Sequence, residues 1–442
     1  MTLTSPFARR VMGVFATRVV RFVLGFAISF TLARILGPSG RGVYSIATLT
    51  PTTLVNLGHL GLPNAFSFFA GRGRSGARML RLGLLMSAVL SAALIGLTLI
   101  ALPVLSDTLL RAASYDLLLL AIVAIPFQLA AAFAGATLIG RQTMRNYNVI
   151  LIGQTVLMLV MIVTLVGILD LGVMGAVIAT IVVGAATAVA TTLELRRAVA
   201  ADPDDAVRPG VRIRELGSFG AKIYPASLAG FFGYRADVFL LSALLGDPRA
   251  IGLYTLGVSL AELTFFVPDA VSTVFFPRVA GMQRESADEK VAAVTRFTVL
   301  ITLIATALLI PAATLAVNIV LPDFRESLAP FLVLLPGIIC LTVAKVLASY
   351  VGGLGIPLRV ALASGSALAV NIIANLVLIP PLGIMGAALA SLISYTINAT
   401  LLLTIASRLS RRPPLDFVLP TRAELSRLRD GLREAKSLLQ DR

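Results

Sequence analysis

Long apolar runs of about 20 residues follow one another along almost the whole chain, separated by short polar segments. A helix of about 20 residues crosses the roughly 30 Å hydrocarbon core of a bilayer, and it satisfies its own backbone hydrogen bonds where lipid offers none. Only 13% of the residues are charged, whereas a soluble domain carries about 25%. The sequence therefore predicts an all-α polytopic membrane protein, and most of its function is expected within the bilayer.

The apolar runs divide into about twelve transmembrane helices. We expect them at 13–36, 43–69, 79–102, 116–139, 147–168, 172–194, 219–245, 252–277, 294–320, 328–351, 358–379 and 383–407. Because the number is even, the chain returns to the side on which it starts. Both termini are therefore expected on one side of the membrane.

Basic residues are distributed unevenly over the segments that connect these spans. They cluster in alternate segments, such as 72–81 and 196–222, whereas the other segments hold only Arg34, Arg41, Arg111, Arg249 and Arg325. Cytoplasmic loops of membrane proteins carry an excess of Lys and Arg, so this pattern predicts that both termini are cytoplasmic. The same asymmetry accounts for the net charge of +15, and no nucleic-acid partner is needed to explain it.

An internal repeat relates the two halves of the sequence. The segment ARILGPSGRGVYSIATL after the first span recurs as SALLGDPRAIGLYTLGVSL after the seventh, which aligns Gly37 with Gly246. Before the sixth and twelfth spans, Gly172 aligns with Gly383 at nearly the same offset, close to 210 residues. Six spans per copy give both copies the same orientation. We therefore expect two six-helix lobes related by a pseudo-two-fold axis along the membrane normal, with a site between them.

The repeat also predicts how the chain is divided. Residues 1–205 would form the N-terminal lobe and residues 206–410 the C-terminal lobe, with the boundary in the polar segment ADPDDAVRPG. Residues 411–442 would form a cytoplasmic tail, in which leucines recur at helical spacing among Arg and Lys. This pattern is typical of a basic amphipathic helix on an anionic leaflet, or of a short helix that packs on the protein's own cytoplasmic face.

Several segments carry a family resemblance. LARILGPSGRGVYSI, YRADVFLLSALLGDPRAIGLYTLGVSLAE and NIIANLVLIPPLGIMGAALASLISY occur in the expected order. Together they resemble the polysaccharide flippases, or lipid-linked oligosaccharide flippases, of the multidrug/oligosaccharidyl-lipid/polysaccharide (MOP) exporter superfamily, over residues 10–410. The resemblance implies two helical lobes around a central cavity that opens by alternating access.

The resemblance also implies a function. The protein would move a polyprenyl-diphosphate-linked oligosaccharide from the inner to the outer leaflet of the bacterial cytoplasmic (inner) membrane, for cell-surface polysaccharide biosynthesis. Expected partners are this anionic lipid-linked glycan, membrane lipids, and a polysaccharide polymerase or glycosyltransferases of the same pathway.

Four basic residues at membrane depth are candidate contacts for the anionic substrate, because a charge in the bilayer is costly and needs a reason. Arg18 and Arg21 share one face of the first span, where they either face the cavity and bind a diphosphate bidentately or extend to the lipid headgroups. Arg235 in span 7 either contacts phosphate or sugar or forms an ion pair between helices. Lys345 in span 10 is a second anion contact or the partner of a carboxylate.

Four titratable residues are candidates for proton or ion coupling. His59 in span 2 aligns with Asp269 in span 8 by the repeat offset, and histidine titrates near neutral pH. Glu262 lies seven residues before Asp269, on the same helical face. Asp237 lies two residues after Arg235, too close in sequence to pair with it along the helix, and a structural role is the alternative for this residue.

Other functional classes find little support in the sequence. Cys340 and His59 are the only residues of their types, so disulfide frameworks and Cys/His metal sites are not expected. No phosphate-binding loop or catalytic motif occurs, so we expect neither cofactor nor enzyme. A cation-coupled multidrug antiporter of the same fold is the first alternative, although the first six spans hold no Asp or Glu at membrane depth. A membrane-embedded glycosyltransferase is the second, and the short outer segments argue against it.

Overall fold

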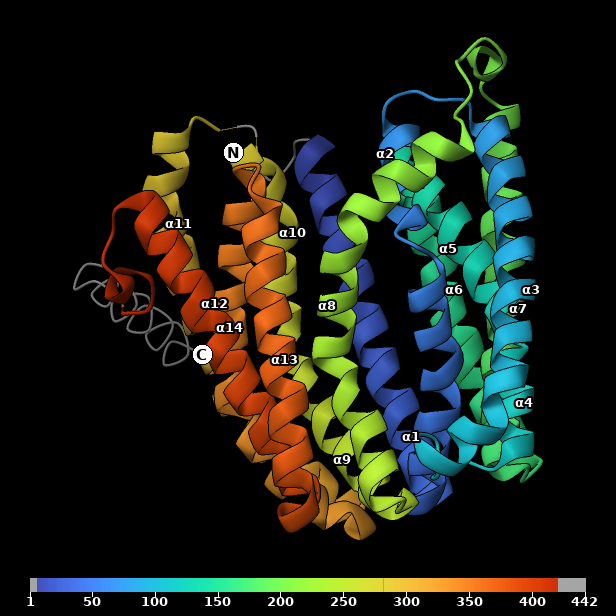
Figure 1. Cartoon of the computed structure of the whole chain (residues 1–442), viewed down its shortest axis with the longest axis vertical. Helices are drawn as coiled ribbons and strands as arrows, with labels where there is room; N and C mark the ends of the chain where they lie inside the picture. Colours follow the sequence, from blue (N-terminus) through green and yellow to red (C-terminus); the bar gives the residue numbers. More distant parts are fainter. Residues whose placement is uncertain (1–5, 281, 420–442) are drawn as a thin grey trace, which may run out of the picture.

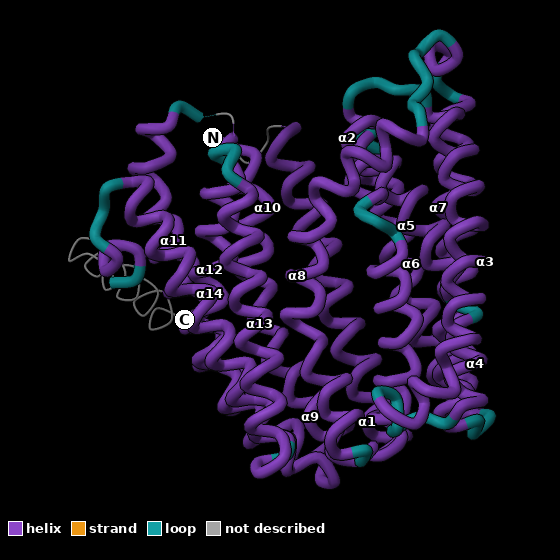
Figure 2. Tube along the Cα trace, viewed as in Figure 1, coloured by secondary structure: helices purple, strands orange, loops and turns teal. Residues whose placement is uncertain are grey.

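The computed structural model describes residues 6–280 and 282–419, without the side chains of 6–19, 22, 226, 273, 274, 276–278 and 280. Within this part every regular element is helical (Figures 1 and 2). The N-terminal helices are α1 (Pro6–Gly58), α2 (Leu62–Gly71), α3 (Gly76–Thr108), α4 (Tyr115–Ile122), α5 (Ile125–Gly140), α6 (Met144–Met161) with a π-helical extension (Ile162–Ile168), and α7 (Gly172–Ala200).

The C-terminal helices begin after a 3₁₀ turn at Pro203–Ala206. They are α8 (Ile213–Leu245), α9 (Pro248–Glu262), a 3₁₀ turn (Leu263–Phe265), α10 (Phe266–Ala280), α11 (Arg284–Val320), α12 (Leu328–Gly353), α13 (Pro357–Leu382) and α14 (Ile384–Ser410), with further 3₁₀ turns at Pro322–Ser327 and Pro414–Phe417. Figure 1 shows α1–α7 gathered on one side of the molecule and α9–α14 on the other, with α8 between them. The all-α fold and the two lobes predicted from the sequence are confirmed.

Eleven helices in the described residues are long and apolar enough to cross a membrane. The count differs from twelve because α1 contains the first two expected spans. Its two arms meet at Gly37, which has φ +65°, a conformation that glycine adopts without strain. Figure 1 shows α1 as two arms that run in opposite directions.

Three expected spans are interrupted. The second breaks at residues 59–61 into α1 and α2, and the fourth breaks at residues 123–124 into α4 and α5, just before Pro126. The eighth breaks into α9 and α10 at Leu263–Phe265. Proline removes a backbone donor and crowds the preceding turn, which explains the break before Pro126.

The lobes meet where the repeat places equivalent residues together. A Cβ atom on Gly42 would lie 1.8 Å from the carbonyl oxygen of Pro248, and a Cβ on Gly252 would lie 1.8 Å from that of Pro38. Only glycine permits this approach of α1 to α9. The Ser45 hydroxyl donates to Thr255 Oγ1 at 3.3 Å, again across the repeat offset of 210 residues. This reciprocal contact is what a two-fold relation between lobes produces.

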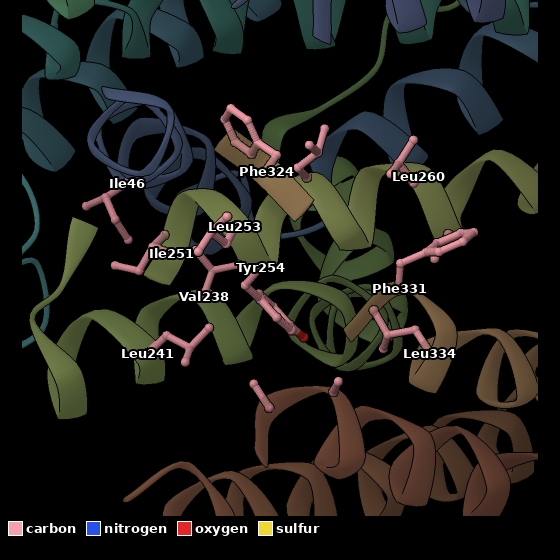
Figure 3. Packing of buried hydrophobic residues seen from close by; sticks show 14 of the residues in the cluster. Ile46, Val238, Leu241, Ile251, Leu253, Tyr254, Leu260, Phe324, Phe331 and Leu334 are labelled. Carbon is pink, nitrogen blue, oxygen red and sulfur yellow. The ribbon is translucent and has the colours of Figure 1, made fainter. Parts of the chain in front are cut away.

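The largest apolar core continues this contact between lobes. Ile46 of α1 lies beside Ile251 and Leu253 of α9, and Tyr254 extends from α9 toward α14 (Figure 3). We call the end of the molecule that carries Gly37 the Gly37 face, and the opposite end, where α1 begins and α14 ends, the terminal face. At the Gly37 face the two lobes are therefore closed against each other.

The polar segment between the lobes is fixed to the N-terminal lobe. Asp205 is buried and accepts hydrogen bonds from the backbone N–H groups of Gly76 (2.7 Å) and Ala77 (2.9 Å), from the Ser75 hydroxyl (3.0 Å) and from Arg141 (2.7 Å). Burial alone would raise the pKa of the Asp205 carboxyl, but these four hydrogen bonds together lower it. Asp205 thus neutralises the N-terminal end of α3 as an anion.

Residues 411–419 of the expected tail are anchored to the C-terminal lobe by Phe417, which is buried in its core. The amphipathic part of the tail, residues 420–442, lies outside the described residues.

Candidate functional site

A cavity of about 360 Å³ lies between the lobes, beside the Gly42–Gly252 contact. Both arms of α1 line one side, and α8 and α9 line the other. The lining residues are Gly25, Ile28, Ser29, Leu32, Arg41, Tyr44, Ser45, Thr48, Leu49, Thr52, Arg235, Val238, Thr255, Val258, Ser259 and Glu262. Its position at the junction of the repeats is where transporters built from parallel repeats bind substrate.

Arg41 is buried in the cavity wall, with 7% of its surface exposed. Its Nη1 donates to the Ser29 carbonyl (2.8 Å), and its Nη2 donates to the Ser29 hydroxyl (3.0 Å) and to the Ser259 hydroxyl (3.2 Å). No carboxylate among the described residues forms an ion pair with Arg41. A buried cation held only by neutral groups leaves uncompensated positive charge in the cavity.

The second charged group is an ion pair. Arg235 of α8 donates through Nη1 and Nη2 to the two carboxylate oxygens of Glu262 on α9, at 3.1 and 3.3 Å. Both side chains are about a third exposed, toward the cavity. Among the described residues, these two and Arg41 are the charged residues that line the cavity, and together they give it a formal charge of +1.

Hydroxyl groups provide most of the remaining polar surface. Thr48, Thr52 and Ser259 each donate to the carbonyl four residues earlier in their own helix. Because that proton is used, the oxygen presents lone pairs to the cavity as a hydrogen-bond acceptor. Sugar hydroxyls are suitable donors for such a wall.

Asp237 lies away from the cavity that its neighbour Arg235 lines. It is buried within the C-terminal lobe, where it accepts hydrogen bonds from Tyr254 and from Ser391 (3.3 Å). The carboxylate thereby joins α8 to α9 and α14. In the other lobe, Tyr44 makes the equivalent contact with Thr180 of α7 at 3.2 Å.

Lys345 and Asp269 form a second ion pair, with 2.6 Å between Nζ and Oδ1. The ammonium group lies 4.1 Å from the centre of the Phe265 ring and 5.6 Å from that of Tyr234, which adds a cation–π contribution. This pair connects α12 to α10 and does not line the cavity.

His59 lies in the break between α1 and α2. Its Nδ1 accepts a hydrogen bond from the Gly61 N–H at 3.1 Å, and its ring meets the edge of Tyr224 on α8, with centroids 6.2 Å apart. Gly61 packs against Gly220 of α8, since a Cβ on Gly61 would lie 2.3 Å from the Gly220 carbonyl oxygen. His59 is thus part of a second contact between α2 and α8.

Arg21 of the first span does not line the cavity. Arg21 is half-buried and lies within electrostatic range of Tyr147 on α6. The side chain of Arg18 lies outside the described residues.

The structure brings four of the eight predicted residues together as two ion pairs. Each of two predicted substrate contacts, Arg235 and Lys345, is bound to a predicted coupling carboxylate, Glu262 and Asp269 respectively. Sequence reasoning did not select Arg41, because it follows the polar turn GPSG and was counted among the residues of an outer segment. The available signal was Gly42, whose repeat partner Gly252 indicates a close helix approach at that point.

Comparisons with known proteins agree with this architecture. Residues 9–283 match the family described as polysaccharide biosynthesis protein. The lipid II flippase MurJ in an inward closed conformation matches with TM-score 0.70 and 14% identity, over 91% of this chain and 89% of that one. A multidrug resistance MATE family transporter of the MOP superfamily, inward-facing, matches with TM-score 0.67 and 15% identity, over 89% and 99%.

An outward-facing structure of a MATE family transporter matches less well, with TM-score 0.52 and 16% identity over 91% of this chain and 95% of that one. No match was found among curated proteins. The family match covers more than half of the chain, and the structural matches show the fold. The chain belongs to the polysaccharide biosynthesis protein family, and it is a multi-pass helical membrane protein with the fold of the MurJ and MATE structures.

Proposed function

We propose that this protein flips a polyprenyl-diphosphate-linked oligosaccharide from the inner to the outer leaflet of the bacterial cytoplasmic membrane. The observation that carries the proposal is the positive cavity between the lobes, in which Arg41 is buried without a counter-charge. A diphosphate is a strong bidentate acceptor for arginine. An anionic headgroup therefore supplies the charge that the protein itself does not.

The rest of the cavity suits the glycan. Its wall of serine and threonine oxygens accepts hydrogen bonds from sugar hydroxyls. The polyprenyl chain would remain in the lipid, while the headgroup passes between the lobes. We infer that the residues act by binding alone, without catalysis.

The closed Gly37 face indicates from which side of the membrane the substrate would enter the cavity. If the basic terminal face is cytoplasmic, as the positive-inside rule predicts, then the Gly42–Gly252 contact closes the outer side. The better match to inward-facing than to outward-facing relatives supports this orientation. Alternating access would then require this contact to open while the terminal face closes.

Coupling to a proton or ion is a further part of the proposal. Asp237 joins three helices of the C-terminal lobe, so a change in its charge would alter their packing. Glu262 and Asp269 are bound to cations, and protonation of either carboxylate would release its partner.

Transport of a defined substrate tests the proposal. The purified protein is reconstituted into liposomes that contain a fluorescent undecaprenyl-diphosphate-linked oligosaccharide, and the flipped fraction is measured with a membrane-impermeant quencher. We expect flipping above that of protein-free liposomes. A cationic multidrug antiporter would instead extrude a cationic dye under an ion gradient and leave the glycolipid in place, and that result would refute the proposal.

A further inference from the structure

Arg41 connects the two lobes at the cavity wall. We propose that the hydrogen bond from Arg41 to Ser259 is a latch that an anion releases. A diphosphate bound to Arg41 would accept the N–H that Nη2 now donates to Ser259, and the loss of this bond between the lobes would help to open the Gly37 face. The inference rests on the proposed function for the identity of the anion. The contact itself is a feature of the structure.

The latch crosses from one repeat to the other. Arg41 is anchored in its own lobe by two hydrogen bonds to Ser29 on the first arm of α1, and it reaches the opposite lobe through the 3.2 Å bond to Ser259 of α9. The Ser45–Thr255 hydrogen bond lies one turn further along the same contact. Breaking the Ser259 bond therefore leaves Arg41 held in the N-terminal lobe and removes one of the polar contacts that join α9 to α1.

The donor geometry indicates an anion as the ligand. The Nε–H of Arg41 is buried without an acceptor, although buried donors are normally satisfied. Nε and Nη2 form one edge of the guanidinium, which offers two parallel N–H groups to a phosphate or carboxylate. A bidentate anion on this edge would satisfy Nε and would compete with Ser259 for Nη2.

The repeat supplies an internal control for a packing role. The residue that aligns with Arg41 in the second copy is Ile251, which is wholly buried. An aliphatic side chain therefore packs well at the equivalent place beside the same pair of glycines. Position 41 thus departs from the repeat by carrying a charge, and the packing of the two helices does not require a charge there.

The nearest carboxylate of the cavity is already engaged. Glu262 lies three residues after Ser259 on α9, and hence on the same face, but both of its oxygens accept hydrogen bonds from Arg235. An incoming anion thus meets a guanidinium that no side-chain carboxylate neutralises.

Cross-linking between the lobes tests the latch. Ser45→Cys and Thr255→Cys are introduced in a Cys340→Ser background, because Cys340 is the only native cysteine, and the rate of disulfide formation in liposomes reports closure of the Gly37 face. Undecaprenyl diphosphate and inorganic pyrophosphate are the two probes. We expect undecaprenyl diphosphate to slow cross-linking several-fold in this protein, and to have no effect when Arg41→Gln is added.

Two further variants separate the parts of the latch. Ser259→Ala should slow cross-linking without any anion and should retain binding of undecaprenyl diphosphate, whereas Arg41→Gln should weaken that binding about 10- to 100-fold. Arg81→Gln is the control, because Arg81 is exposed on α3, away from the contact between α1 and α9. This control should behave like the parent protein.

The outcomes distinguish the latch from the transport proposal. Arg41-dependent binding with an unchanged cross-linking rate would overturn the latch and leave the flippase proposal standing. Slower cross-linking by either diphosphate, in a protein that does not flip the glycolipid, would support the latch and refute the flippase. An equal response to pyrophosphate would identify the free anion as sufficient, and a response only to the lipid would assign the site to a lipid headgroup.

Discussion

Gly42 and Gly252, which lie 210 residues apart, pack so closely that neither position has room for a Cβ atom. The two glycines occupy equivalent places in the two copies of the repeat, and each faces the backbone of the other lobe. The two copies of the repeat thus contact each other at equivalent glycines. The cavity that Arg41 lines lies beside this contact.

Alanine at either glycine should separate the lobes. In Gly42→Ala the new methyl group would lie 1.8 Å from the Pro248 carbonyl oxygen, so the helices must move apart. We expect a lower thermal unfolding midpoint, and a slower Ser45–Thr255 cross-link in the double-cysteine protein. Gly96→Ala is the control, because nothing lies within 4 Å of a Cβ there and alanine favours an exposed helix by about 1 kcal/mol. Equal midpoints for the two variants would show that the contact is not essential.

The same cross-link should stop transport reversibly. Ser45 and Thr255 are 3.3 Å apart at their oxygens, so the two cysteines can be joined with little movement. Because alternating access requires the Gly37 face to open, oxidation should abolish flipping and a reductant should restore it. Transport that continues at full rate in the oxidised protein would show that this contact does not open during the cycle.

The paired charges of the cavity should be energetically coupled. Glu262→Gln leaves Arg235 without its counter-charge and raises the formal charge of the cavity from +1 to +2. We expect the double variant Arg235→Gln/Glu262→Gln to be destabilised less than the sum of the two single variants. The coupling should be about 1 kcal/mol, since both side chains are partly exposed. Thermal unfolding of the four proteins measures it, and strict additivity would contradict the ion pair.

Asp205 should stabilise the protein in a pH-dependent manner. Its pKa is lowered in the folded protein, so its contribution is present above the pKa of an unfolded aspartate, about 3.9, and is lost as the pH falls through the lower folded value. Removing one partner of such a buried pair costs about 3 kcal/mol or more. Asp205→Asn should therefore lower the unfolding midpoint at pH 7.

The difference between Asp205→Asn and the parent protein should shrink as the pH is lowered below about 4. Asp204→Asn is the matched control, because the Asp204 side chain is exposed, and its midpoint should follow that of the parent. A destabilisation by Asp205→Asn that is the same at all pH values would argue against the charged carboxylate as the cause.

Much of the fold could be predicted because the bilayer constrains it strongly. Apolar length specifies the spans, and the Gly37–Gly246 alignment indicates the two lobes before any contact is known. The breaks at residues 123–124 and Leu263–Phe265 lie shortly before Pro126 and Pro268, so proline inside an apolar run indicates them, although the hydropathy is continuous across both.

The site was less predictable, because it depends on contacts between distant helices. Sequence reasoning selected Arg235 and Glu262 separately, and their pairing appears only when α8 and α9 are packed together. Arg41 was missed because its burial is caused by α9, which lies more than 200 residues further along the chain. Local sequence alone places it in a polar turn.

The most direct test of the anionic substrate is the rate at which Arg41→Gln and Arg81→Gln flip an undecaprenyl-diphosphate-linked oligosaccharide in liposomes. Both variants lose one arginine from the N-terminal lobe, but Arg41 is buried in the cavity and Arg81 is exposed on α3. We expect Arg41→Gln to flip the glycolipid at least about tenfold more slowly, which corresponds to the loss of one charged contact, while Arg81→Gln retains the parent rate. A parent rate in Arg41→Gln would contradict the assignment of the positive cavity to an anionic lipid-linked substrate.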